Sequence, residues 1–113
     1  MIRFIHLADV HLGAVPDRGC PWSHEREEEI WETFRRVIAS VRRDPVDLLF
    51  IAGDLFHRQP LLKELKEVNY LFSTIPETRV FLMLITHSVN KSLKLFNIRD
   101  VIPFPRTVNN CDL

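Results

Sequence analysis

Three short apolar runs, rich in Ile, Val, Leu and Phe, divide the chain. They cover residues 2–7, 47–52 and 79–85, and runs of this length and composition are typical of buried strands. Between them, residues 23–43 and 61–73 repeat apolar side chains at helical spacing. The order strand, helix, strand, helix, strand predicts an α/β fold: a β-α-β-α-β parallel sheet with right-handed crossovers and both helices on one face.

The same pattern predicts finer details of each element. Ser23 is the expected N-cap of the first helix, and Leu62 is expected to face inward with the other apolar residues of the second. His6 lies inside the first strand and is expected to be a hydrogen-bonded core residue. The pattern weakens after residue 87, where residues 91–97 predict a helical turn or two and residues 101–104 a short strand.

One face of such a sheet lacks a predicted cover. The second and third runs are apolar on both faces, as in parallel strands that are covered on both sides. Two helices on one face leave the other open, and residues 86–113 offer only a partial cover. We therefore expect either a partner, which includes a second copy in a homodimer, or a chain that is a fragment.

Acidic and histidine residues follow the end of each apolar run. Asp9 and His11 follow the first, Asp54 and His57 the second, and His87 the third. Ligands of open α/β sheets bind outside the carboxyl ends of the strands, where these side chains are expected to converge. Carboxylate oxygen and imidazole nitrogen together suit Mn, Fe or Zn. The arrangement predicts metal-dependent hydrolysis.

Two of these segments carry a family resemblance. Residues 9–13, Asp-Val-His-Leu-Gly, and residues 53–58, Gly-Asp-Leu-Phe-His-Arg, resemble the first two motifs of calcineurin-like metallophosphoesterases. The form of the second motif resembles the SbcD-type DNA repair exonuclease subunits in particular. The resemblance covers about residues 1–84 and implies the N-terminal half of a metallophosphoesterase sandwich.

The resemblance also implies roles for individual residues. Asp9 and His11 would bind the first metal ion and Asp54 would bridge two ions, with manganese the expected metal. His87 would be the catalytic histidine facing the phosphate, and His57 would place the DNA strand for cleavage. Arg58 is a weaker candidate for contact with the nucleic-acid backbone, because a solvated helix face explains it equally well. DNA and an ATPase subunit are the implied partners.

The third motif departs from the family. The family has Gly-Asn-His-Asp after the third strand, whereas residues 85–88 are Ile-Thr-His-Ser, so only the histidine is retained. Thr86 replaces an asparagine that ligates the second metal, and a neutral hydroxyl is a poorer ligand. We therefore expect at most one ion and weak or no catalysis. Residues 1–85 are expected to form a truncated metallophosphoesterase domain and residues 86–113 a divergent tail, with a truncation or reading-frame change near Ile85.

The composition indicates the domain size and the cellular compartment, but it does not indicate the reaction. The chain has 113 residues, with 15 basic and 15 acidic side chains, so it is sized for one domain and has no overall field that attracts nucleic acid or membrane. Its two cysteines suit a reduced, intracellular protein. No signal-peptide pattern or membrane-spanning run is present, which predicts a cytoplasmic protein without membrane contact.

Three functions remain open from the sequence. The first is a DNA exonuclease of the double-strand-break repair type. The second is a non-catalytic fragment or pseudoenzyme that binds a metal ion or a partner. The third is another phosphoesterase of the same superfamily, acting on proteins or small phosphodiesters.

Overall fold

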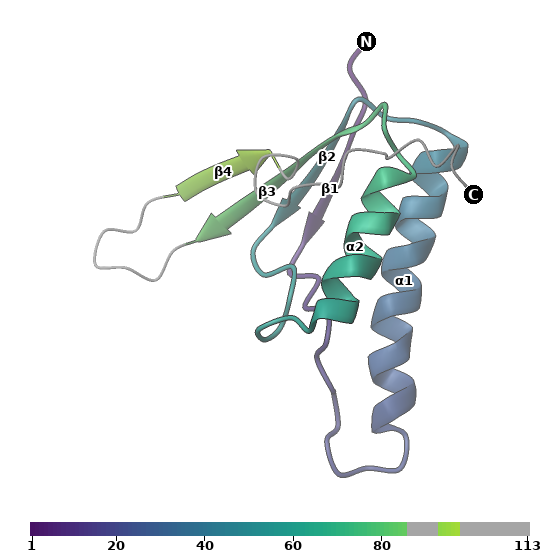
Figure 1. Cartoon of the computed structure of the whole chain (residues 1–113), viewed down its shortest axis with the longest axis vertical. Coiled ribbons are helices and arrows are strands. Elements are labelled where there is room, and N and C mark those ends of the chain that lie inside the picture. The colour runs from purple at the N-terminus through teal and green to yellow at the C-terminus, as the bar shows by residue number, and fades with distance from the viewer. Residues whose placement is uncertain (86–92, 98–113) are drawn as a thin grey trace, which may run out of the picture.

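The computed structural model describes residues 1–85 and 93–97, which form one sheet and two helices (Figure 1). Strands β1 (Phe4–Ala8), β2 (Leu48–Ala52) and β3 (Arg79–Ile85) run parallel in that order. Strand β4 (Leu93–Asn97) pairs with β3 in the antiparallel direction. The predicted α/β fold with a parallel β-α-β-α-β core is confirmed.

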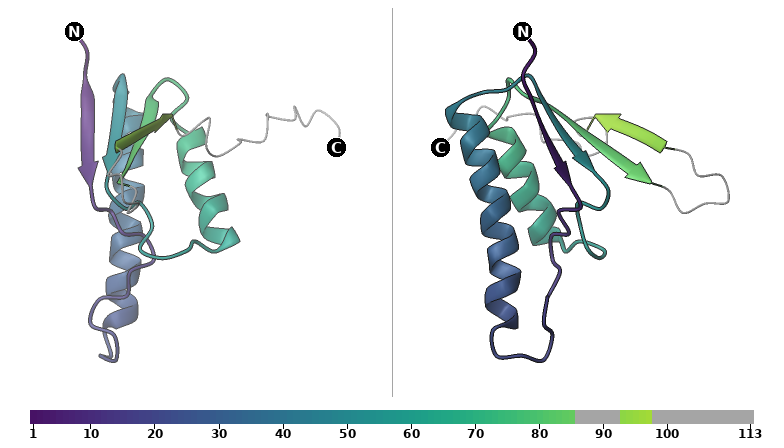
Figure 2. Two further views of the ribbon diagram at one scale, coloured as in Figure 1. Left: turned by 90° about the vertical axis from the view of Figure 1, so that its left-hand side faces the viewer. Right: turned by 180° about the vertical axis from the view of Figure 1, so that it is seen from behind.

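Helices α1 (Ser23–Arg43) and α2 (Leu62–Ser73) cover the same face of this sheet, as Figures 1 and 2 show from different sides. Phe34 of α1 and Phe72 of α2 meet edge to face, with ring centroids 6.0 Å apart. The core forms between the helices and the strands, and most of its free energy comes from the burial of apolar surface. Its main residues are Trp31, Phe34, Ile38, Val41, Leu49, Ile51, Val68, Phe72, Val80 and Leu82.

No helix in the described part of the chain is long and apolar enough to cross a membrane.

The opposite face of the sheet carries a row of aromatic rings. Leu49 and Ile51 of β2 point toward the helices and are fully buried, whereas Phe50 between them points to the other face. Phe50 stacks on Phe81 at a centroid distance of 5.7 Å and meets the exposed Phe4 edge to face at 6.2 Å. Neither α1 nor α2 covers these rings, so this face is apolar and open within residues 1–85.

Two residues face away from the core where the sequence predicted burial. His6 is exposed, because alternate residues of β1 point to the uncovered face rather than toward the helices. Leu62 is 68% exposed, because the buried stripe of α2 runs through Glu64, Val68 and Phe72. A residue two positions before Glu64 lies on the opposite side of the helix.

Two local predictions also differ from the structure. Helix α1 begins at Ser23, but its N-cap is Trp22 and no side chain caps it, so the prediction for Ser23 was wrong by one position. Residues 93–97 form a strand rather than helical turns, because pairing with the edge of β3 decides the conformation of a short ambiguous segment. The strand expected at residues 101–104 lies outside the described residues.

The different burial of two leucines gives a direct test of this arrangement. Leu49→Ala should lower the free energy of unfolding by about 2–5 kcal/mol, because it leaves a cavity under both helices. Leu62→Ala should change it by less than about 0.5 kcal/mol. Chemical denaturation followed by circular dichroism measures both values. Equal losses at the two positions would contradict the inward and outward assignments of these side chains.

Candidate functional site

The pairing of β1 with β2 continues past the ends of both strands. The Asp9 N–H donates to the carbonyl of Ala52 at 2.9 Å, and the His11 N–H donates to the carbonyl of Asp54 at 3.0 Å. The two loops that follow the strands therefore run side by side, as the carboxyl-end placement predicted. These backbone bonds fix where Asp9, His11 and Asp54 emerge from the sheet.

Two leucines anchor the same loops in the core. Leu12 is 1% exposed and Leu55 is 4% exposed, and the Leu12 N–H donates to the Leu55 carbonyl at 2.8 Å. The His57 N–H then donates to the Leu12 carbonyl at 2.9 Å. Neither leucine was among the residues predicted to shape the site. The sequence did carry a signal for their burial, because Leu12 directly follows His11 and Leu55 directly follows Asp54 in otherwise polar loop motifs.

The backbone at the site adopts conformations that side chains rarely allow. Asp9 and His11 have φ angles of 52° and 51°, in the left-handed region that costs non-glycine residues about 1–3 kcal/mol. Gly53 has φ 75°, and a Cβ added there would overlap a carboxylate oxygen of Asp9. The glycine thus lets the second loop approach the Asp9 side chain closely. Such strain is characteristic of functional sites.

His11 lies between Asp9 and His57. Its Nε2 atom is 4.0 Å from a carboxylate oxygen of Asp9. Its Nδ1 atom is 3.2 Å from the Nδ1 atom of His57, and the two rings meet at 60°. One Nδ1 atom must carry the proton that the other accepts. The Asp9 side chain is 70% exposed and that of His11 36% exposed, so both are open to a ligand.

The other predicted site residues are placed differently. Asp54 is exposed. Its backbone carbonyl, and not its carboxylate, accepts the backbone N–H of His11. Within residues 1–85 and 93–97, no three His, Cys, Asp or Glu side chains come together closely enough to hold a metal ion. His87 lies outside the described residues. The structure thus offers two donors that suit Mn, Fe or Zn, Asp9 and His11, and not a complete ligand set.

Arg58 forms an ion pair with another residue of the chain, Glu64. Its two terminal nitrogens donate to the two carboxylate oxygens of Glu64, at 3.0 and 2.9 Å. Glu64 is only 6% exposed and also accepts the N–H of Leu61 at 2.7 Å. Glu64 was not among the residues predicted to shape the site. Its position three residues after the N-cap Leu61 is the spacing at which a glutamate side chain accepts the N-cap N–H, and this half of the capping-box pattern was the available signal.

Arg58 and Glu64 each stabilise the charged form of the other. Burial of Glu64 favours its neutral form, but the hydrogen bonds from Arg58 and from the Leu61 N–H outweigh this and hold the pKa of Glu64 below its ordinary value. The hydrogen bonds to Glu64 raise the pKa of Arg58 in turn. Both side chains are therefore charged at neutral pH, and the ion pair is formed.

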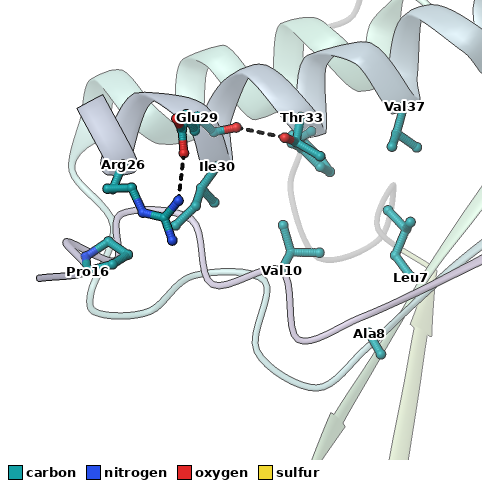
Figure 3. Close-up of a pocket in the computed structure, with 10 residues that line it drawn as sticks. Leu7, Ala8, Val10, Pro16, Arg26, Glu29, Ile30, Thr33 and Val37 are labelled. Carbon is teal, nitrogen blue, oxygen red and sulfur yellow. Dashed lines mark hydrogen bonds and ion pairs between the residues drawn. The ribbon is translucent and has the colours of Figure 1, made fainter. Parts of the chain in front are cut away.

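A separate cavity of about 450 Å³ lies between the loop after β1 and the first half of α1 (Figure 3). Its lining is largely apolar and includes Leu7, Val10 and Ile30. The ion pair between Arg26 and Glu29, 3.2 Å long, lies at its rim. None of the predicted metal or catalytic residues lines this cavity, so the candidate site is the exposed cluster at the strand ends.

A parallel sheet with Asp-x-His after its first strand and Gly-Asp-x-x-His after its second defines part of a metallophosphoesterase domain. The chain belongs to the calcineurin-like phosphoesterase family, whose sequence profile matches residues 2–96, and the predicted resemblance is confirmed. It is similar to the DNA double-strand break repair protein Mre11 of Methanopyrus kandleri, at 47% identity over 60 residues, which are 52% of this chain and 12% of that protein.

The corresponding protein of Aeropyrum pernix is 33% identical over 81 residues, which are 71% of this chain and 19% of that protein. The Mre11 protein of Saccharolobus solfataricus is 30% identical over 87 residues, 67% of this chain and 22% of that protein. The chain therefore spans about an eighth to a fifth of the length of the curated relatives it matches.

Alanine at Gly53 tests the close approach to Asp9. Gly53→Ala should shift the amide resonances of Asp9 and His11 in ¹⁵N-correlated NMR spectra, because the new methyl group displaces the carboxylate. Gly19→Ala is the matched control, since Gly19 also has positive φ, 94°, but a Cβ there meets nothing within 4 Å. Both variants carry backbone strain of about 1 kcal/mol or more. Unchanged Asp9 and His11 resonances in Gly53→Ala would contradict the contact.

The Glu64 carboxylate should make stability depend on pH. Its pKa in the folded chain lies below the ordinary 4.5, so its contribution is fully present above that value and is lost as pH falls through the lowered pKa. Glu64→Gln should therefore destabilise the chain most at neutral pH, and the loss should shrink at acidic pH as the carboxyl becomes protonated in the folded chain. Chemical denaturation at neutral and at acidic pH measures this difference. A loss that is equal at both would show that the ionised carboxylate is not the stabilising group.

Proposed function

We propose that Asp9 and His11 bind a divalent metal ion and that the chain contributes this half-site to the hydrolysis of phosphodiester bonds in DNA. The observation that carries the proposal is the position of His11, with Nε2 facing the Asp9 carboxylate and Nδ1 facing His57. Membership of the calcineurin-like phosphoesterase family and similarity to proteins named for double-strand break repair support the reaction and the substrate.

The residues present suit a metal on chemical grounds. A metal-bound histidine usually has its second ring nitrogen engaged by a neighbour, which fixes the tautomer and the ring orientation. The contact between the Nδ1 atoms of His11 and His57 leaves Nε2 of His11 free for the ion. Gly53 leaves room for the Asp9 carboxylate beside it. When bound, the ion would polarise the phosphoester and lower the pKa of a bound water.

The remaining roles follow the family pattern. Asp54, which bridges two ions in the family pattern, would add its carboxylate to the single ion, His57 would place the DNA strand, and His87 would face the phosphate. Manganese is the proposed metal, with at most one ion held by this chain. A cytoplasmic setting, an ATPase subunit as partner and a homodimer through the open sheet face complete the proposal.

A second candidate function is a metal-binding half-site without catalysis. Two observations favour it: no three His, Cys, Asp or Glu side chains of the described residues come together to hold a metal ion, and residues 85–88 lack most of the third family motif. Binding with no turnover is its expected outcome.

Calorimetry with Mn²⁺ tests the metal site. The chelator-treated chain should bind Mn²⁺ saturably, and Asp9→Asn should raise the dissociation constant at least about 10-fold. Asparagine tolerates the left-handed backbone of position 9, so this variant changes the charge alone. Glu77→Gln, at an exposed carboxylate far along the chain, is the matched control and should bind as the unchanged chain does. Equal binding by Asp9→Asn would contradict the proposed ligand.

A substrate panel tests the reaction. Duplex DNA ends, phosphopeptides and small phosphodiesters are each incubated with the chain and Mn²⁺. Cleavage of DNA ends that disappears in Asp54→Asn would support the exonuclease, because the Asp54 carboxylate is then lost. Cleavage of the other substrates alone would contradict DNA as substrate. Saturable Mn²⁺ binding without any cleavage would establish the non-catalytic half-site.

A further inference from the structure

The Arg58 guanidinium connects three segments of the chain. It donates to both carboxylate oxygens of Glu64 at the start of α2 and to the carbonyl of Gln59 at 3.2 Å. It also lies against Gly13, where an added Cβ would come within 3.4 Å of its Cζ atom. Gly13 is buried and has φ 86°. The group thus joins the loop after β2 to both α2 and the loop after β1.

This connection lies next to the two histidines. Arg58 directly follows His57, and Gly13 directly follows Leu12, whose carbonyl accepts the His57 N–H. The His57 side chain is exposed, so burial in the core does not hold it against His11. The Arg58 guanidinium is hydrogen-bonded to Glu64 and lies beside Gly13. It can therefore restrain the backbone of the loop next to His57.

We propose that Arg58 is a positioning residue, which holds the loop carrying His57 against the loop carrying His11 through its contacts with Glu64 and Gly13. The inference rests on the proposed function, in which Asp9 and His11 bind the ion. It assigns Arg58 a different role from contact with the DNA backbone. A guanidinium that turned to a phosphate would leave the Glu64 carboxylate buried without its partner, which is strongly unfavourable.

Two conservative variants separate positioning from phosphate contact. Arg58→Lys keeps the positive charge but cannot make the forked pair of hydrogen bonds. Glu64→Gln keeps Arg58 and frees its charge. If Arg58 positions the loop, both variants disturb the two histidines. If it contacts phosphate, Arg58→Lys retains most DNA binding and Glu64→Gln preserves or strengthens it.

The contact between the His11 and His57 rings is the primary measurement. A nuclear Overhauser effect between the two rings should be present in the metal-free 113-residue chain and should disappear in both variants. The dissociation constant for Mn²⁺ should also rise about 10- to 100-fold. Arg35→Lys and Glu67→Gln are the matched controls, because they make the same two changes in a 2.6 Å ion pair between α1 and α2 away from the site. Both controls should keep the ring contact.

The outcomes distinguish this inference from the proposed function. Failure of the unchanged chain to bind Mn²⁺ would contradict the metal site, while the ring contact would still decide the role of Arg58. A ring contact that persists in folded Arg58→Lys and Glu64→Gln would overturn positioning. Loss of the ring contact in the Arg35 and Glu67 controls would also overturn it, by showing a general effect of stability.

A second NMR measurement uses only the unchanged chain, so it decides the question even if the variants unfold. Slow rotation of the clamped guanidinium should give separate resonances for the Arg58 Nη atoms. Adding a short DNA duplex should leave these resonances as they were. Averaged Nη resonances, or marked changes on adding DNA, would overturn the proposal in favour of a free or phosphate-binding Arg58.

Discussion

The candidate site depends on the backbone pairing of β1 and β2 continuing beyond the two strands. The carboxylate of Asp9 and the ring of His57 are exposed and the ring of His11 is partly exposed, so burial in the core does not set the positions of these side chains. Hydrogen bonds between the two loops set them instead, with the buried Leu12 and Leu55 as anchors. This pairing also supports the left-handed backbone of the first loop, which isolated chains rarely adopt.

Much of the fold could be predicted from the sequence, because the apolar runs are short, well bounded and separated by clear helical repeats. Residues 79–85 form a strand as predicted, and the second helix begins within one residue of its predicted start. The errors arose where burial depends on the partner face. His6 lies on the sheet face that α1 and α2 leave open, and Leu62 lies on the outward side of α2. Local sequence patterns do not show which of these surfaces the rest of the chain covers.

The candidate site was predicted in part. The spacing of Asp9, His11 and His57 indicated the residues and the edge of the sheet, because strand ends converge in parallel sheets. It could not show that His11 would lie between the other two, since that depends on positive φ angles at exposed loop positions. The engagement of Arg58 by Glu64 depends on the path of the loop between β2 and α2, which sequence spacing alone does not fix.

Amide hydrogen exchange of the unmodified chain reports the hydrogen bonds between the two loops, so it shows whether they hold the site together. The amides of Leu12 and His57 donate to backbone carbonyls of the paired loops. We expect them to exchange within about tenfold of the Leu49 amide in the central part of the sheet, because they open with the same cooperative unit. Exchange as fast as that of the exposed Gly19 turn would contradict it, and would mean that the two loops are not held together.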